Sequence, residues 1–260
     1  METKNLLLKI DNNIGLITIN RPDKLNALNA ETVTELFQVL KKLRQNDSVS
    51  VIIITGSGEK AFVAGADIAE ISRHDEISGR IFATRGQRVY RYLEKLEKPV
   101  IAAINGFALG GGCELAMACH IRIASDNAKF GQPEINLGLL PGYGGTQRLP
   151  RLIGTTKALY FLLTGEMFDA QKALEMGLIS EIVPQSELMT RATKIAEILC
   201  EKSPIAVKYI LQAVTEGIEQ NLDTALHIES ELFGNICATE DMKEGTAAFL
   251  EKRKPNFKGK

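Results

Sequence analysis

Two glutamates stand beside glycine-rich turns in the middle of the chain. Glu114 closely follows three consecutive glycines, Gly110–Gly112, and Glu134 directly follows Pro133. Consecutive glycines allow the backbone to adopt positive φ angles and to approach a ligand closely. Both glutamates are expected at helix starts, because the run ELAMAC can be helical and because proline favours the first helical position. A second glycine turn follows at Gly142, Gly144 and Gly145.

Two such carboxylates can hold one water molecule between them. The ionised carboxylate accepts a proton from water, while the protonated one donates a proton to a carbon next to a carbonyl. Charge then develops on the carbonyl oxygen and requires fixed N–H donors, the loss of one of which typically costs about 2.7–4 kcal/mol of barrier. The glycine turn before Glu114 is a candidate for one donor, and FVAGADI, Phe62–Ile68, is a candidate for the other.

The residues also have simpler interpretations. A glutamate at a helix start is favoured by the helix dipole without any catalytic role, and either glutamate could be a solvated surface residue. Cys113 is interpreted as a small packed residue, since no histidine adjoins it as a general base. The three histidines, His74, His120 and His227, are interpreted as surface or packing residues.

Motifs for metal, dinucleotide and phosphate-loop chemistry are absent from the sequence. The sequence has no cluster of histidines and cysteines, so we expect no metal site. GYGGTQ does not match GxGxxG, and GxxxxGK[ST] is absent, so neither a dinucleotide site nor a P-loop is expected.

Composition indicates an ordinary soluble globular protein. The chain has 260 residues, of which 45% are apolar and 24% charged, and its net charge of −1 does not suggest binding to nucleic acid. Four cysteines without CxxC spacing are interpreted as reduced thiols of a cytosolic protein. No apolar run approaches the length of a membrane span, and we expect a cytoplasmic location.

Strands and helices alternate through the first part of the chain. Asn29 is expected to cap a helix over 30–44, and 89–96 is helical in pattern before Pro99. The segment 74–86 is either a mobile segment over a site or an ordinary surface helix and loop. Periodicity alone favours an α/β fold with a doubly wound sheet. The expected strands are 6–10, 14–19, 51–54, 100–104 and 121–124.

The remainder is mainly helical. Residues 182–183 form one last short strand, and Pro204 marks a boundary that divides the chain into a core, residues 1–200, and a helical region, residues 201–260. Sixty residues of amphipathic helix cannot bury their apolar faces alone, so they are expected to pack on the core, on a neighbouring subunit, or on both. The expected helices are 155–163, 170–176, 186–201, 204–216, 221–236 and 239–252.

Several motifs together carry a resemblance to a known family. They are ALGGGCELAMAC, FGQPEINLGLLPGYGGTQRL, FVAGADI and NRPDKLNAL, and the similarity continues to FLEKRKPNFK near the C-terminus. These stretches resemble the crotonase family, and most closely its enoyl-CoA hydratases. The pair GGGCE and GQPE at this separation is highly specific.

The resemblance implies a fold, a reaction and roles for particular residues. The fold is a spiral of ββα repeats with a C-terminal helical region. The reaction is addition of water to a 2-enoyl-CoA in fatty acid β-oxidation or a related pathway, with no cofactor beyond the CoA of the substrate. Glu114 and Glu134 match the acid/base pair, the backbone N–H groups of Ala66 and Gly111 match the oxyanion hole, and Gly142 lines the catalytic water.

Coenzyme A contacts are implied for several further positions. Phosphate binding is assigned to Lys24 or the C-terminal lysines, because Ala69 stands where relatives can carry a phosphate-binding lysine. Phe233 and Lys252 match positions that reach a neighbouring subunit's ligand in a hexamer of two trimers, although Phe233 can equally be a core aromatic. The segment AGADI, with Ala64, Gly65, Asp67 and Ile68, matches residues that wrap the pantetheine and adenine.

Three other functions compete with this interpretation. Within the family, the chain could be an isomerase, or a hydratase of a branched or specialised acyl-CoA. The acyl pocket is placed at 71–83 and 139–143. The alternative that is not an enzyme is an RNA-binding protein, which would need a basic stripe on its surface. The short run Lys252–Lys260 does not favour this function.

Overall fold

The computed structural model describes residues 3–260. Strands β1 (Leu6–Asp11) and β2 (Ile14–Ile19) confirm the first two expected strands, and they pair as an antiparallel hairpin. Asn12 and Asn13 form its turn with φ of 48° and 64°, the backbone that a two-residue hairpin turn requires. Helix α1 (Ala30–Arg44) confirms the expected helix, and the Asn29 side chain caps it by accepting from the Thr32 N–H.

Within residues 3–260, ten strands are divided between two sheets. The larger sheet has the order β1-β2-β3-β5-β7-β10 and is parallel from β2 onwards. The smaller sheet has the order β4-β6-β8-β9, with β4, β6 and β8 parallel and β9 antiparallel. The larger sheet adds β3 (Val51–Gly56), β5 (Val100–Ile104), β7 (Ile121–Ser125) and β10 (Glu181–Val183). The smaller sheet consists of β4 (Ala61–Val63), β6 (Phe107–Leu109), β8 (Lys129–Gly131) and β9 (Phe168–Asp169).

Each turn of the spiral places one strand in each sheet before a helix. Strands β3 and β4 precede α2 (Ile68–Ile71) and α3 (Glu76–Glu94), and β5 and β6 precede α4 (Gly111–Ala118). Strands β7 and β8 precede the 3-10 helix η2 (Pro133–Leu137), α5 (Gly145–Ile153) and α6 (Thr155–Thr164). The expected spiral of ββα repeats is confirmed. The doubly wound sheet favoured by periodicity is wrong, because a short strand in a second sheet follows each long strand.

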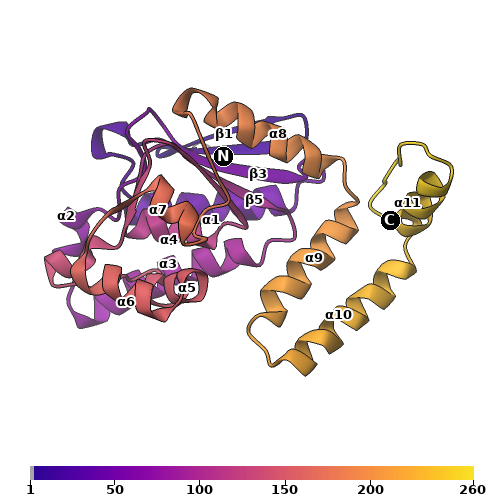
Figure 1. Ribbon diagram of the computed structural model, residues 1–260. Coiled ribbons are helices and arrows are strands. Elements are labelled where there is room, and N and C mark those ends of the chain that lie inside the picture. Colours follow the sequence, from indigo (N-terminus) through magenta and orange to yellow (C-terminus); the bar gives the residue numbers. More distant parts are fainter. Residues whose placement is uncertain (1–2) are drawn as a thin grey trace.

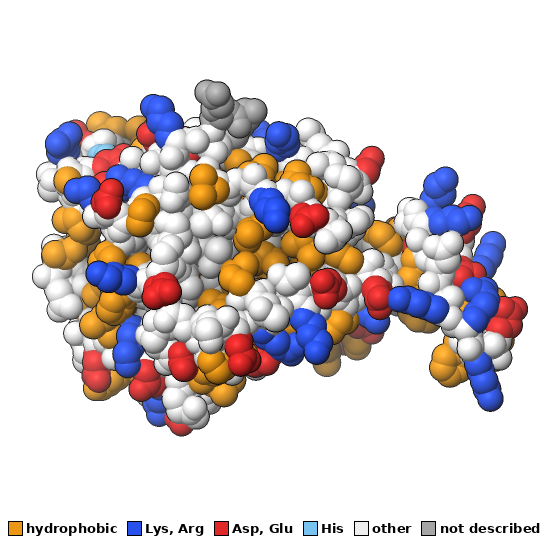
Figure 2. Space-filling model, turned by 90° about the horizontal axis from the view of Figure 1, so that it is seen from above, with side chains coloured by type: hydrophobic (Ala, Val, Ile, Leu, Met, Phe, Trp, Pro, Cys, Tyr) orange, Lys and Arg blue, Asp and Glu red, His pale blue; other side chains and the backbone are white. Residues whose placement is uncertain are grey.

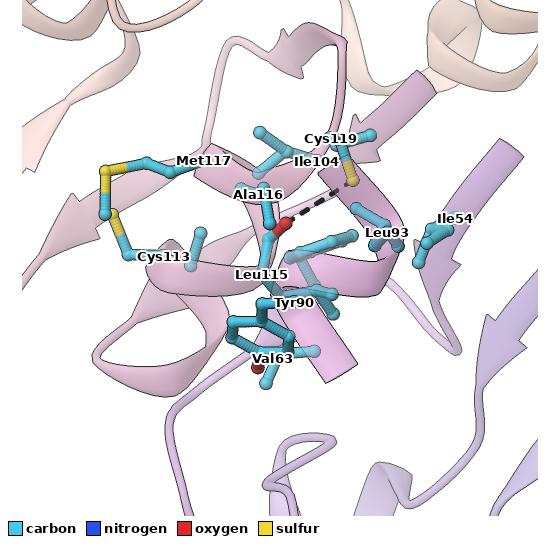
Figure 3. Packing of buried hydrophobic residues seen from close by; sticks show 14 of the residues in the cluster. Ile54, Val63, Tyr90, Leu93, Ile104, Cys113, Leu115, Ala116, Met117 and Cys119 are labelled. Carbon is cyan, nitrogen blue, oxygen red and sulfur yellow. Dashed lines mark hydrogen bonds between the residues drawn. The ribbon is translucent and has the colours of Figure 1, made fainter. Parts of the chain in front are cut away.

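The long strands are buried on both faces. Ile52 and Ile54 of β3 face the main core, whereas Val51 and Ile53 face a second cluster under α8 (Leu188–Cys200). Figure 1 shows α8 across the larger sheet, opposite the side that carries α3 and α4. Figure 3 shows α4 at the centre of the main core, where Leu115 and Tyr90 pack close together.

The segment 74–86 is helical for most of its length. Asp75 caps α3 with a reciprocal pair of bonds to Ser78, and the helix continues to Glu94. The helical alternative for this segment is therefore confirmed. Its partly buried residues Phe82 and Ala83 face the cavity described below, so the helix is more than a surface element.

The C-terminal helices extend away from the sheets. In Figure 1, α9 (Pro204–Gly217), α10 (Leu222–Cys237) and α11 (Glu240–Leu250) leave the main body, and Figure 2 shows the far end projecting as a lobe rich in charged side chains. Ion pairs of Lys208 with Glu97, at 3.1 Å, and of Arg91 with Glu219, at 2.7 Å, tie α9 and the turn that follows it to the body. The part of the chain between α6 and α9 holds α7 (Ala170–Glu175), β10, the 3-10 helix η3 (Gln185–Glu187) and α8.

Large apolar side chains remain uncovered on these helices. Ile218 is 76% exposed, Phe233 68% and Phe249 84%. Exposed apolar surface of this extent is typical of a site of protein association. Over residues 3–260, we find no helix with the length and apolar character needed to cross a membrane.

The close approach of α4 to β4 can be tested by substitution of the glycine at the contact. A Cβ on Gly112 would overlap the carbonyl oxygen of Val63, so we expect Gly112→Ala to destabilise the fold by about 1–3 kcal/mol or more. Thermal unfolding followed by circular dichroism measures the effect. The matched control is Gly79→Ala in α3, where the nearest heavy atom to the new methyl is 3.9 Å away and the change should stabilise by about 0.5–1 kcal/mol. Equal midpoints for the two variants would contradict the packing.

Candidate active site

The carboxyl ends of three neighbouring strands build the site. Strands β4, β6 and β8 lie side by side and parallel, so the segments that follow them meet at one edge of the smaller sheet. Residues 64–66 follow β4, residues 110–114 follow β6, and residues 132–134 follow β8. Three of the sequence motifs, separated by up to seventy residues, are brought together in this way.

The glycine turn after β6 has a backbone that only glycine adopts readily. Gly110 has φ of 47° and ψ of −121°, and its N–H donates to the carbonyl of Gly131 at 2.9 Å. A Cβ on Gly110 would overlap Oε1 of Glu134. The turn therefore needs glycine both for its conformation and for the approach of the carboxylate.

Two backbone N–H groups lie next to each other at this edge. Leu28 forms a parallel bridge with Ala66, bonding the Gly65 carbonyl and the Asp67 N–H, so the Ala66 N–H points away from Leu28. Gly111 begins α4, where backbone N–H groups have no partner within the helix. A Cβ placed on Gly111 would lie 3.6 Å from the Ala66 nitrogen. The structure thus brings together the two N–H groups expected to form an oxyanion hole.

Glu114 lies in the first turn of α4 and is almost completely buried. It is 1% exposed, and its Oε1 accepts from the N–H groups of Tyr143 at 2.8 Å and Gly145 at 2.6 Å. These donors belong to the second glycine turn. The second glycine turn is therefore joined to the helix after the first one by a pair of hydrogen bonds to Glu114.

Glu134 stands at the start of η2, directly after Pro133, as expected. Gln132 is buried next to it and, with its amide nitrogen turned toward the carboxylate, donates to both oxygens at 3.2 Å. Gln132 is a site residue that the motif GQPE contains but that sequence reasoning did not single out. Its neighbour Gly145 lies too close to Gln132 and Pro141 to carry a side chain without movement.

Burial shifts the titration of both glutamates. Desolvation, with the charge of Glu134 adding to it, raises the pKa of Glu114 to about 8, against the opposing effect of the N–H groups of Gly145 and Tyr143. Desolvation raises the pKa of Glu134 to about 7. Two adjacent carboxyls of this kind titrate as a pair. Near neutral pH the pair can hold one proton, which provides one acid and one base.

Both glutamates, together with Ala66 and Gly111, line a cavity of about 500 Å³. Its remaining walls come from the segments in which the acyl pocket was expected, with α3 on one side and the loop after η2 on the other. Gly142 lies in the wall, and its carbonyl accepts from Gln87 at 2.9 Å. Apolar wall residues are Ile68, Ile71, Phe82, Ala83, Leu109, Leu137, Leu139, Leu140 and Tyr143.

Some expected ligand contacts lie elsewhere in this chain. Ala64, Gly65 and Ile68 line the cavity, but Asp67 instead pairs with Arg21 at 3.0 Å. Exposed Lys24 precedes Leu25, whose carbonyl accepts from the Ala64 N–H, so the lysine lies near the cavity without lining it. Phe233 in α10 and Lys252 after α11 are exposed on the projecting helices and do not reach this cavity.

The cysteine and histidines divide between packing and the cavity wall. Cys113 is buried, and desolvation raises the pKa of its thiol to about 12, which agrees with a packed residue. His120 accepts from the Val100 N–H at 2.9 Å and serves as a packing residue, whereas His74 lines the cavity beside Phe82. Among residues 3–260, no three His, Cys, Asp or Glu side chains gather in a way that could hold a metal ion.

The burial of Glu114 leads to a prediction about stability. Its folded pKa lies above the ordinary value of 4.5, so ionisation opposes folding. This penalty is absent below about pH 4.5, grows as the pH rises and is complete above about pH 8. We therefore expect Glu114→Gln to raise the thermal midpoint at pH 9 by several degrees and to change it little at pH 4.5.

The matched control is Glu59→Gln, because Glu59 is exposed in a loop. That change should leave the midpoint similar at both pH values. A Glu114→Gln midpoint equally shifted at pH 4.5 and pH 9 would mean that ionisation of Glu114 carries no such penalty.

The chain is similar to proteins of one family along its whole length. The family model described as enoyl-CoA hydratase/isomerase matches residues 9–260. A short-chain-enoyl-CoA hydratase of Clostridium acetobutylicum is 50% identical over 254 residues, 98% of this chain and 97% of that protein. A crotonyl-CoA hydratase of Syntrophomonas wolfei is 48% identical over 257 residues, 99% of each chain.

Solved structures agree with these relatives. The crystal structure of an enoyl-CoA hydratase from Bacillus anthracis matches with a TM-score of 0.95 and 40% identity, covering 99% of this chain and 100% of that chain. Fold, motifs and full-length similarity therefore agree, and the chain belongs to the enoyl-CoA hydratase/isomerase family.

Proposed function

We propose that the chain is an enoyl-CoA hydratase that adds water, reversibly and syn, to a 2-enoyl-CoA to give a 3-hydroxyacyl-CoA. The observation that carries the proposal is the placement of Glu114 and Glu134 in one cavity with the N–H groups of Ala66 and Gly111. Two carboxylates alone could serve many reactions. Two adjacent N–H donors add a place for a carbonyl oxygen that becomes negatively charged.

In the proposed mechanism the thioester oxygen accepts from the Ala66 and Gly111 N–H groups. The ionised carboxylate of the pair removes a proton from water as the water oxygen bonds to C3. The π electrons move toward the thioester oxygen, and the protonated carboxylate then donates its proton to C2. Syn addition requires both carboxylates to act on the same face of the bound substrate, which their place in one cavity allows.

The walls and the relatives support a short, straight acyl chain. Tyr143, Phe82 and Leu140 bound the cavity, and two relatives carry names that specify short-chain and crotonyl substrates. We assign crotonyl-CoA or a close homologue as substrate, in fatty acid β-oxidation or a related acyl-CoA pathway. An isomerase would move a proton with one carboxylate, whereas this site holds two.

The coenzyme A portion is proposed to follow the segment after β4. Ala64, Gly65 and Ile68 line the cavity beside Ala66, and Lys24, which precedes the Leu25 that bonds Ala64, is proposed to meet a phosphate. Asp67 contributes by holding this loop through Arg21. No metal or redox cofactor takes part in the proposed chemistry, since the two carboxylates and two N–H groups supply each step.

A test of the mechanism is the replacement of each glutamate. Glu114→Gln and Glu134→Gln keep the shape but remove the acid/base group, so each should lower kcat by about 10²- to 10⁴-fold with little change in substrate binding. The double variant should cost far less than the product of the singles, as expected for groups that act together. Loss of enoyl thioester absorbance measures the rate, after dialysis of the protein against a chelator.

Glu59→Gln serves as the matched control and should retain full activity. Full hydratase activity in either active-site variant would refute the two-carboxylate mechanism. No turnover by the unaltered protein on any straight-chain substrate from crotonyl-CoA upwards would refute the proposed activity itself.

We also propose a cytoplasmic homo-oligomer, a hexamer of two trimers, in which Phe233 and Lys252 reach a neighbouring subunit's ligand. The exposed apolar faces of α9 and α10 support association. Sedimentation at micromolar concentration should give a hexamer. Removal of residues 204–260 should leave an insoluble or inactive remnant, and a monomer in sedimentation of the full chain would contradict the proposal.

A further inference from the structure

One face of α3 contacts the site along its length. Gly86, Tyr90 and Glu94 are spaced by four residues and so lie on the same side of the helix. A Cβ on Gly86 would overlap the Tyr143 ring, which packs edge-on against the Tyr90 ring at 5.4 Å between centroids. This face of α3 therefore touches both the second glycine turn and the core beneath α4.

Tyr90 is completely buried, yet it carries a polar hydroxyl. The hydroxyl donates to the carbonyl oxygen of Gly111 at 2.7 Å. A carbonyl oxygen has two acceptor positions, and the first carbonyl of an α-helix already accepts from the N–H four residues later. Figure 3 shows the ring beside Val63 and beneath Leu115, so the core holds this hydroxyl in place.

The last turn of α3 fixes the loop that contains Tyr143, on the other side of the site. Glu94 pairs with Arg148 through two contacts of 2.5 and 3.0 Å, and Arg148 donates to the Tyr143 carbonyl at 2.7 Å. The Tyr143 N–H in turn donates to Glu114. One helix thus fixes both the residue that supplies an oxyanion donor and the loop that supplies the donors to Glu114.

We propose that Tyr90 is a positioning residue that orients the Gly111 N–H toward the thioester oxygen. The first turn of a helix has few internal hydrogen bonds, and Gly110–Gly112 add three glycines to it. The bond from Tyr90 restrains the Gly111 carbonyl, and the peptide plane of that carbonyl meets the plane of the Gly111 N–H at the Gly111 Cα. The bond thereby limits how far the Gly111 N–H can turn. The proposal rests on the proposed hydratase function, because it assigns Gly111 a role in polarising the substrate carbonyl.

The test is Tyr90→Phe, which removes one oxygen atom and keeps the ring. Loss of a typical hydrogen bond predicts a fall in kcat of about 2- to 10-fold, with KM for crotonyl-CoA unchanged. A second readout is the infrared stretch of the thioester carbonyl of bound butyryl-CoA, which has no double bond to hydrate. Binding to the unaltered protein should lower this frequency, and the variant should lower it less.

The matched control is Tyr92→Phe, the same change on the same helix. Tyr92 packs against Phe37 of α1, away from the site, so kcat and the carbonyl stretch should equal those of the unaltered protein. Unchanged kcat and carbonyl stretch in Tyr90→Phe, or a lower thermal midpoint alone, would overturn the positioning role. The carbonyl stretch needs no turnover, so its result is distinguishable from a failure of the hydratase proposal.

Discussion

The parallel pairing of β6 between β4 and β8 is the constraint on which the site depends. These strands have only three residues each, so they add little stability of their own. Their value is positional, because parallel neighbours end at one edge and deliver their following segments to the same place. The close contact of Gly112 with the Val63 carbonyl then sets the distance between α4 and β4, and so between the Gly111 and Ala66 N–H groups.

The same arrangement creates an electrostatic cost that the proposed reaction would use. Glu114 is buried in the core-facing turn of α4, where an ionised carboxylate loses its hydration, and Glu134 lies close enough to add repulsion. Two N–H groups offset part of this cost without abolishing it. A site built only for stability would avoid such a pair. A pair poised near neutral pH is what a reaction that needs an acid and a base together requires.

Much of the site could be predicted from the sequence because its residue types carry the signal. Glycines at 110 to 112 and a proline before Glu134 each have a backbone consequence that can be read locally. The strands of the smaller sheet could not be predicted, since three residues are too few for a periodic pattern. Because these short strands leave no pattern in the sequence, periodicity suggested one doubly wound sheet. Only the family resemblance indicated a spiral.

Contacts across the fold were also beyond local patterns. Arg148 acts through Glu94, which lies 54 residues away in the chain, and Tyr90 lies in a helical stretch whose pattern predicts ordinary core packing. Helix α5 was not expected, because the pattern around Pro150 and the preceding glycines does not favour a helix. The roles of such residues depend on tertiary contacts, so these roles can be recognised only in the folded structure.

The position of the C-terminal helices bears on how complete one chain is as a ligand site. Every residue that lines the cavity lies between Ala64 and Tyr143, and α9, α10 and α11 lie on a different part of the molecule. An acyl-CoA is longer than its reacting thioester, so part of it must extend beyond the cavity. The exposed Phe233 and Lys252 do not reach the cavity of their own chain, so the only acyl-CoA that they can contact is one bound to a neighbouring chain. Association that covers the apolar faces of α9 and α10 would therefore also bring such residues to a neighbour's substrate, which links assembly to binding through the same helices.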